Sequence, residues 1–203
     1  MLRQLVLLIC VGSSVAQSCD TCTCFNVKTV PVSTNKVCEH SPLFGQAASV
    51  VSLEANLDSM CLEFLSTPVA GNALVVTTIN YDTDTYTRHE VIETPIDCGV
   101  LSGTGPSSAG VLYALDFFLG EPCNGTYVIY ECVLLGSPCI TDESCVTVFI
   151  VSTNKVECQE CIDLGIALAQ ESFPHLEFYY LPRTIDDVCR TDAYSKYRLS
   201  PLD

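Results

Sequence analysis

The fold is decided between residues 111 and 135, which read VLYALDFFLGEPCNGTYVIYECVLL. Two runs in this stretch, Val111–Leu119 and Tyr127–Leu135, are rich in the β-branched and aromatic residues that favour strands. Between them, Glu121–Gly125 contains Pro and Asn-Gly, which favour a tight turn. The stretch therefore predicts two adjacent strands joined by a turn.

Similar apolar runs recur on both sides of this pair at short intervals. They are Ala47–Leu53, Leu74–Ile79, Tyr86–Glu93, Cys145–Ser152 and Leu176–Leu181. Turn-forming clusters at Pro68–Asn72 and Ser102–Gly110 lie between some of them. Regular short strands with such turns indicate an antiparallel sandwich or barrel rather than alternating strands and helices. A meander that closes on itself also removes exposed strand edges.

One segment late in the chain departs from this pattern. Asn154 followed by Glu157 fits a helix N-cap with a carboxylate three residues on, and Pro174 ends the segment. Its apolar residues recur at helical spacing: Ile162, Ile166, Ala169 and Phe173. We therefore expect a helix over about residues 156–172 with one apolar face packed on the sheet.

The first residues predict the compartment. Arg3 precedes an apolar run over residues 5–11, and small residues follow at Ser14 and Ala16, as in a cleaved secretory signal. Elsewhere no run reaches the roughly 18 apolar residues of a membrane helix. We expect a secreted, extracellular protein without membrane insertion. The expected organisation is a signal peptide (1–16), a cysteine-rich N-terminal segment (17–40), a barrel (41–190) and a C-terminal tail (191–203).

Composition excludes several classes of protein. The 203 residues include 9 Lys and Arg against 24 Asp and Glu, so the formal net charge is −15. With 48% hydrophobic residues the chain is too apolar for a disordered protein. Because nucleic-acid affinity depends on cations that neutralise phosphates, we expect no nucleic-acid partner.

Cysteine usage points to disulfides. The chain has 14 cysteines, and Cys10 belongs to the expected signal peptide, so the mature chain has an odd number. At least one cysteine is therefore free or pairs between chains. A disulfide-linked dimer is thus an alternative to a monomer. The spacings at Cys19–Cys24 and Cys158–Cys161 also occur in zinc and redox sites, but the two clusters are distant in sequence and lack a His at ligand spacing. We expect no metal site. Cys158 and Cys161, one helical turn apart, can pair with each other or with a loop cysteine.

The hexapeptide VSTNKV occurs twice, at residues 32–37 and 151–156. Its flanks differ, which argues against an internal duplication. We interpret the two copies as similar strand-exit turns.

Several short motifs follow one another in an order that resembles a known family. They are Gly45-Gln46-Ala47, Cys61 with Asn72, Leu115-Asp116-Phe117, Tyr127–Cys132, Val148–Val151 and Cys189. Gly45-Gln46-Ala47 looks like the Gly-x-Trp signature of the lipocalins, and Cys61 with Asn72 looks like their second-strand cysteine and turn. Leu115-Asp116-Phe117 looks like their Thr-Asp-Tyr motif, and Tyr127–Cys132 looks like the strand that ends in Tyr-Ser-Cys. Val148–Val151 looks like the strand before the helix, and Cys189 looks like the C-terminal cysteine. The closest resemblance is to apolipoprotein D-like members, although Ala47 stands where the family has Trp.

The resemblance implies an all-β fold with one C-terminal helix, an eight-stranded antiparallel up-and-down barrel. It also implies two disulfides. Cys61 should pair with Cys189, and Cys132 with Cys22, Cys24 or Cys38.

An eight-stranded barrel can hold one small ligand, and its inward residues alternate with outward ones. If Cys132 points outward to its disulfide, Tyr127, Ile129 and Glu131 face inward. By the resemblance Phe149 and Val151 also face the cavity, with Leu74 and Val76 on an earlier strand. Such a pocket suits a small hydrophobic molecule with one polar end, such as a lipid, sterol, retinoid or pigment. We therefore predict a secreted carrier without a cofactor, against the alternative that these side chains fill a solid core.

Two other functions remain open. An unpaired cysteine would suit a cross-linked extracellular structural or interaction protein with a filled barrel. Catalysis is not expected, because His40, His89 and His175 are scattered without a nucleophile or metal-ligand motif. Some lipocalins are isomerases that use a cavity cysteine, so a cysteine-dependent isomerase is the less favoured alternative.

Asn124-Gly125-Thr126 is a glycosylation sequon in a predicted turn. We expect a glycan on Asn124, against the alternative of an unmodified Asn-Gly turn.

Overall fold

The computed structural model describes residues 24–49, 57–80, 86–107, 110–135, 146–183 and 189. In chain order its elements are α1 (Thr34–His40), β1 (Leu43–Ser49), β2 (Ser59–Ser66), β3 (Ala73–Asn80), β4 (Tyr86–Asp97), β5 (Val100–Ser107), β6 (Gly110–Cys123), β7 (Thr126–Leu135), β8 (Thr147–Ser152), α2 (Gln159–Ser172) and β9 (Phe178–Tyr180). The expected signal peptide at 1–16 and tail at 191–203 lie outside the described residues.

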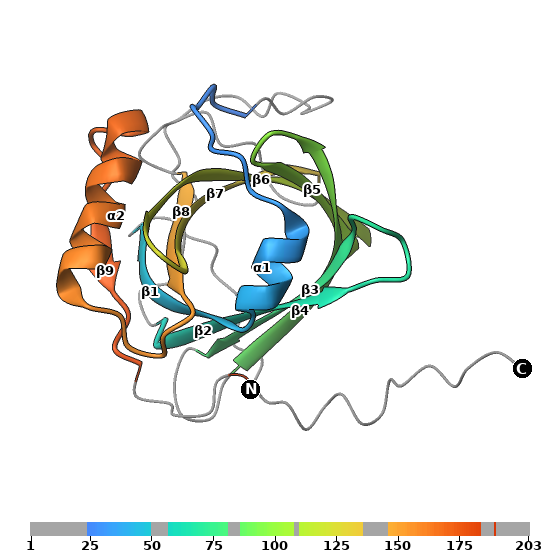
Figure 1. The fold of residues 1–203 in the computed structure, drawn as a ribbon, viewed down its shortest axis with the longest axis horizontal. Helices are drawn as coiled ribbons and strands as arrows, with labels where there is room; N and C mark the ends of the chain where they lie inside the picture. Colours follow the sequence, from blue (N-terminus) through green and yellow to red (C-terminus); the bar gives the residue numbers. More distant parts are fainter. Residues whose placement is uncertain are drawn as a thin grey trace, which may run out of the picture.

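Eight strands form a closed antiparallel barrel, viewed along its axis in Figure 1. Neighbours pair in the order β2-β3-β4-β5-β6-β7-β8-β1, and β1 pairs back onto β2 at Leu43↔Leu62. The ninth strand, β9, pairs only with β1 among the described strands. This confirms the predicted class, an all-β up-and-down barrel.

Two strands are absent from the sequence prediction. Residues 100–107 of β5 read VLSGTGPS, a composition typical of turns, yet they pair along their whole length with β6. The other, β2, pairs with β3 from Ser59↔Asn80 to Ser66↔Ala73. Pairing with β6 over the whole strand, and with β4 over residues 100–104, outweighs the weak intrinsic preference of β5 for strand.

Helix α1 was also not predicted, and it contains most of the first VSTNKV copy. Ser33 is its N-cap and accepts a hydrogen bond from the Lys36 backbone N–H at 3.1 Å. In the second copy Val151 and Ser152 end β8, where Val151 pairs with Gly45 and Tyr127. The interpretation as two similar strand-exit turns is therefore wrong for the first copy. Of the two copies, only the second pairs with neighbouring strands among the described residues.

Helix α2 starts five residues after the predicted Asn154 cap. Cys158 is its N-cap, and the Cys158 Sγ accepts a hydrogen bond from the Cys161 backbone N–H at 3.4 Å. Figure 1 shows α2 lying along the outside of the barrel, where it packs against β6, β7 and β8. Its buried face includes Ile162 and Ala169.

The core has two parts. One fills part of the barrel and has as its large members Leu43, Met60, Phe64, Phe118, Tyr127 and Phe149. The other lies between α2 and the outer face of the barrel and has as its large members Tyr130, Ile150, Ile162, Phe173 and Leu176. The alternation along β7, with Tyr127 inside and Val128 outside, is the expected period of two.

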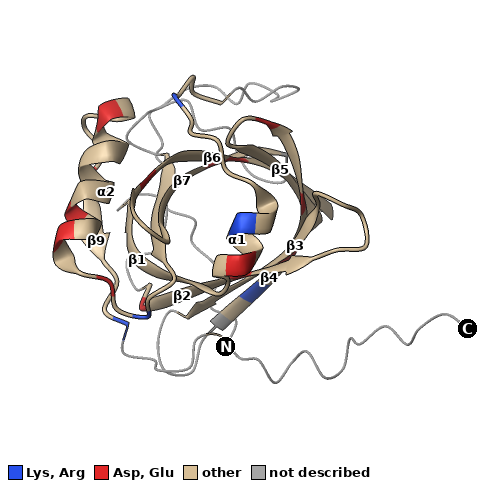
Figure 2. Ribbon diagram, viewed as in Figure 1, with Lys and Arg blue, Asp and Glu red and all other residues tan. Residues whose placement is uncertain are grey.

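The charge of the chain is spread over these elements. Figure 2 shows acidic positions on α2 and on several strands, with basic positions at few places. None of the described helices has the length and apolar character that crossing a membrane requires.

Candidate ligand-binding interior of the barrel

Five of the seven residues predicted to line a cavity lie on the inner face. Tyr127, Ile129, Phe149 and Val151 belong to the interior cluster. Glu131 follows Ile129 by two residues on β7, and its register partner Asp116 shares a face with Phe118 of that cluster. The inference from an outward Cys132 therefore places these β7 side chains on the face where the structure has them.

The predicted positions of Leu74 and Val76 are wrong by one residue. Their neighbours Ala73 and Val75 belong to the interior cluster, so Leu74 and Val76 point to the outer face of β3. Val76 is nevertheless buried, which makes β3 apolar on both faces. Without alternation between polar and apolar residues, the sequence does not indicate which face is inside.

One end of the barrel is closed by the segment that contains α1, which crosses the barrel in Figure 1. The Thr34 hydroxyl donates to the Gly71 carbonyl at 2.8 Å, in the β2–β3 turn. The Val30 N–H donates to the Phe118 carbonyl at 2.9 Å. Gly99 permits this approach, because its φ is +71° and a Cβ there would lie 2.0 Å from the Val30 carbonyl oxygen.

Charged and polar groups at this closed end are paired. Lys36 Nζ lies 2.5 Å from a carboxylate oxygen of Glu121 at the end of β6. His40 Nδ1 and the Tyr127 hydroxyl are hydrogen-bonded at 2.6 Å. Below them Phe118 and Tyr127 pack edge to face with ring centroids 6.0 Å apart. The closed end is thus a packed and electrostatically balanced floor.

Three acidic side chains meet on the inner face further from that floor: Glu93 of β4, Asp116 of β6 and Glu131 of β7. We call them the interior carboxyl trio. Asp116 and Glu131 are direct register partners. Glu93 is opposite Gly103 of β5, which is opposite Ala114 of β6. The Glu93 side chain lies over Gly103, where a Cβ would be 3.8 Å from the Glu93 Cγ, and Glu93 is hydrogen-bonded to Asp116 across β5.

The surroundings of the trio favour its protonated forms. Burial raises the pKa of Glu93 to about 7; the hydrogen bond with Asp116 opposes the rise, and repulsion from Glu131 and Cys38 adds to it. Burial, followed by repulsion from Asp116, raises the pKa of Glu131 to about 8. Burial and the adjacent Glu93 carboxylate raise the pKa of Asp116 well above its ordinary value. Near neutral pH the three groups therefore hold shared protons.

The interior around the trio retains accessible surface. The inward side chains of Thr77, Val91, Asp116 and Glu131 are only partly buried. Glu93 between them is 3% exposed. The carboxyls are therefore deep in the protein, yet the inner face beside them is not completely filled.

Sequence reasoning found Glu131 but not Glu93 or Asp116 as inner-face residues. A signal was present in the strand at 111–119, where Ala114, Asp116 and Phe118 alternate and only Asp116 is charged. An acid on the apolar side of a strand is unusual unless it has a partner. Glu93 had no comparable signal, because its contact with Asp116 depends on the register of β4, β5 and β6.

The structure contains the disulfides Cys24–Cys132, Cys61–Cys189 and Cys123–Cys161. The second is the pair that the resemblance implies, and the first selects Cys24 among the three candidate partners of Cys132. Cys161 pairs with Cys123, the last residue of β6, rather than with Cys158. Cys38, Cys98 and Cys158 are free, and the last two are exposed. Several intramolecular disulfides indicate an oxidising environment.

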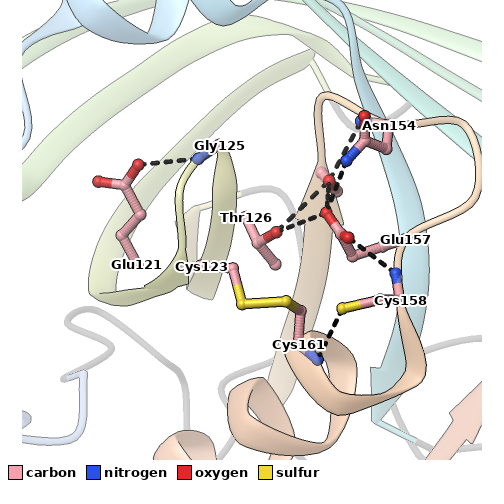
Figure 3. Close-up of a disulfide and its surroundings, with 9 residues drawn as sticks. Glu121, Cys123, Gly125, Thr126, Asn154, Glu157, Cys158 and Cys161 are labelled. Carbon is pink, nitrogen blue, oxygen red and sulfur yellow. Dashed lines mark hydrogen bonds between the residues drawn. A yellow bond between two sulfur atoms is a disulfide. The ribbon is translucent and has the colours of Figure 1, made fainter.

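Figure 3 shows the surroundings of the Cys123–Cys161 disulfide. Burial opposes ionisation of Glu157, but hydrogen bonds from Ser152, the Cys158 N–H, Thr126 and Asn154 lower its pKa to about 2. Glu157 thus joins β7, β8 and the start of α2. Glu157, Cys158 and Cys161 are close enough to share a metal ion, but the Cys161 sulfur is already in the disulfide. Without that thiolate the cluster is a poor metal site.

Gln46 is a buried polar residue to which the sequence assigned no role. Its amide donates to the backbone carbonyls of Phe44 at 3.0 Å and Asn154 at 2.8 Å. Its side-chain oxygen accepts from the Glu157 backbone N–H at 3.1 Å and from Arg183. Next to it, Ala47 packs in the cluster under α2. Gln46 thus ties β1 to the β8–α2 connection.

The other predicted positions are scattered over the fold. Asn124 is exposed in the turn between β6 and β7, a position that is accessible for a glycan. His89 and His175 are exposed, whereas His40 contacts Tyr127 at the closed end. The structure does not bring the three histidines together.

No protein-family model matches the chain, and no curated protein matches it.

Proposed function

We propose that this protein is a secreted carrier of lipocalin-like type, which binds a small molecule with an apolar body and a polar group inside its barrel. The supporting observation is the division of the inner face. A packed apolar floor adjoins a partly exposed region that contains carboxyl groups. This combination of apolar walls and few polar groups is typical of small-molecule sites. The signal-like residues 1–16 and the disulfides support secretion.

Blocking the interior tests the proposal. Val91 lies on the inner face with accessible surface, so Val91→Trp should occupy the space beside the trio. The matched control is Ile92→Trp, because Ile92 is the next residue of β4 and points outward with 39% exposure. The probe is N-phenyl-1-naphthylamine, an uncharged apolar dye that fluoresces when it leaves water. We expect saturable binding to the unaltered protein and to Ile92→Trp, and about tenfold weaker binding to Val91→Trp.

Equal dye binding by the two Trp variants would contradict an interior site, and so would absence of binding to the unaltered protein. Far-ultraviolet circular dichroism checks that both variants retain the fold.

A second candidate is an extracellular protein that is cross-linked through cysteine. The observation that favours it is the pair of exposed free thiols, Cys98 and Cys158. This function predicts a covalent dimer of the secreted protein on a non-reducing gel, which is lost in Cys98→Ser or Cys158→Ser. A monomer in every case would contradict it.

A further inference from the structure

We propose that the molecule held in the barrel is a small organic ammonium ion, whose protonated amine binds the interior carboxyl trio and whose apolar body lies against the inner face beside it. This inference rests on the carrier function proposed above and specifies the class of its ligand.

Three strands supply the carboxyls from one side of the barrel. Asp116 and Glu131 are paired across β6 and β7, and Glu93 reaches them over Gly103. Two of the neighbouring inward residues are small or apolar: Ala73 is opposite Glu93, and Leu101 is opposite Asp116. Thr147 of β8 is opposite Glu131 and adds one hydroxyl. The acidic groups therefore converge on one place within a mostly apolar wall.

An independent observation is an unsatisfied atom in this place. Glu93 is 3% exposed, and its Oε2 has no hydrogen-bond partner while the same carboxyl is bonded to Asp116. A buried carboxyl oxygen without a donor is costly, and a buried carboxylate without a cation more so. The ion pairs shown by the described residues, Lys36–Glu121 and Arg88–Glu90, both lie outside the trio. A donor that enters the barrel would satisfy this oxygen.

The chemistry of the place favours an ammonium ion over a metal. A primary ammonium has three N–H donors, which can serve three carboxyl groups at once. Calcium takes six to eight oxygen ligands, whereas of the residues opposite the trio Ala73 and Leu101 offer no side-chain oxygen and Thr147, opposite Glu131, offers a single hydroxyl. Val91 of β4 and Leu62 of β2 pack against the interior cluster on the same inner face but are only partly buried, so they provide an apolar surface for the rest of the molecule.

Binding would exchange protons for the cation. When the ammonium enters, a carboxylic acid of the trio releases its proton to water and keeps the electron pair, so the site gains a positive ion and loses a proton. The titratable groups that face the trio are its own members and Cys38 of α1. His89 is four residues before Glu93 on the same face of β4 and is exposed. Affinity for the ammonium should therefore rise with pH as the trio ionises.

The test is isothermal titration of the full secreted chain with ligands that differ only in their polar group. The probes are n-octylamine, n-octanol and n-octanoate, and the same three groups on a 2-phenylethyl body. Alkylamines stay protonated at pH 8, as Lys does with its pKa of about 10.4. We expect the amines to bind about tenfold or more tighter than the alcohols, with the carboxylates weakest. Amine affinity should fall about tenfold from pH 8 to pH 6, with proton release measurable in buffers of different ionisation enthalpy.

Variants assign the effect to the trio. Glu131→Gln and Asp116→Asn should lower amine affinity about tenfold and leave alcohol binding unchanged. Glu90→Gln is the matched control, since Glu90 is an acid on the outer face of β4 that pairs with Arg88. If the carboxamide variants lose their circular dichroism spectrum, the three-group comparison and its pH dependence on the unaltered protein decide the question.

The outcomes separate this inference from the carrier function. Alcohols or carboxylates that bind as tightly as amines would overturn the ammonium ligand and leave the carrier intact. Calcium chloride that binds through the trio while the amines do not would overturn it in favour of a metal. If no probe of either body binds, both the ammonium ligand and the carrier function are contradicted.

Discussion

The floor of the barrel and the interior carboxyl trio use the same strands in opposite ways. At the floor Lys36 neutralises Glu121, His40 bonds Tyr127, and aromatic side chains fill the space. At the trio three acids have each other as neighbours, and one buried oxygen has no donor.

This difference distinguishes the groups that stabilise the fold from the groups that we propose to bind a ligand. Paired and packed groups contribute to folding, whereas like charges that share a buried place oppose it. A fold retains such acids at a cost in stability, and a ligand that neutralises them would recover that cost. The two regions should therefore respond differently to mutation and to pH.

The largest expected effect is at the floor. Phe118→Ala removes a ring that is 1% exposed and packs on Tyr127, and it should lower the free energy of unfolding by about 3–5 kcal/mol. Urea denaturation measures the loss. Val111→Ala on the same strand is the control, because Val111 is 57% exposed and should change stability by less than about 0.5 kcal/mol. Similar values for the two variants would contradict a packed floor.

Next in size is the link between the floor and α2. Cys123→Ser with Cys161→Ser opens a disulfide that spans 38 residues between the end of β6 and α2. The unfolded chain gains freedom, so the free energy of unfolding should fall by about 2–4 kcal/mol in thermal or urea denaturation. The single variant Cys158→Ser keeps the disulfide and serves as control. A double variant as stable as the control would show that α2 is held by its packing alone.

Ionisation of the interior carboxyl trio, in contrast, should lower the free energy of unfolding of the unaltered protein. Burial raises the pKa of Glu93 to about 7, so between about pH 4.5 and 7 the folded protein binds more protons than the unfolded chain. The stabilising contribution of protonated Glu93 is therefore fully present below about pH 4.5 and is lost as the pH rises through about 7. Glu131, with its pKa raised to about 8, extends the loss to higher pH.

Glu93→Gln removes this titration. The variant should unfold with a free energy about 2 kcal/mol higher than the unaltered protein at pH 9, and with nearly the same free energy at pH 4. Urea denaturation at the two pH values measures the difference. If the unaltered protein is as stable at pH 9 as at pH 5, the account of the trio is contradicted.

The smallest effect is expected for the ion pair at the floor. Lys36 and Glu121 have side chains that are 42% and 22% exposed, so solvent screens their attraction. Lys36→Met should lower the free energy of unfolding by less than about 1 kcal/mol, and less still in high salt. A loss of several kcal/mol in denaturation would show that Lys36 holds α1 over the barrel more firmly than its exposure implies.

The sequence predicted the parts of this molecule that depend on local composition. Strands with β-branched and aromatic runs, such as β6 and β7, and the apolar face of α2 follow from periodicity. Strand β5 did not, because Gly103, Gly105 and Pro106 signal a turn. Pairing with β6 along the whole strand, and with β4 over residues 100–104, makes this segment a strand. The first VSTNKV copy became a helix for a related reason: its conformation depends on whether a strand is available to pair.

The residues of the candidate site also fall into two groups: those that a local sequence pattern predicts and those whose position depends on pairing between strands. Glu131 was found because β7 alternates and Cys132 marks its outer face. Leu74 and Val76 were misplaced because β3 is apolar on both faces. The contact of Glu93 with Asp116 depends on the register of three strands, β4, β5 and β6, which no local sequence pattern contains.

The central claim is that the barrel binds a small molecule, and native mass spectrometry of the protein purified from its own source tests it most directly. The same sample, denatured without reduction, gives the mass of the polypeptide with its disulfides and any glycan. We predict that the native protein is heavier by a few hundred daltons and that this mass is lost on denaturation. Equal native and denatured masses, or a disulfide-linked dimer without a bound molecule, would contradict the carrier function.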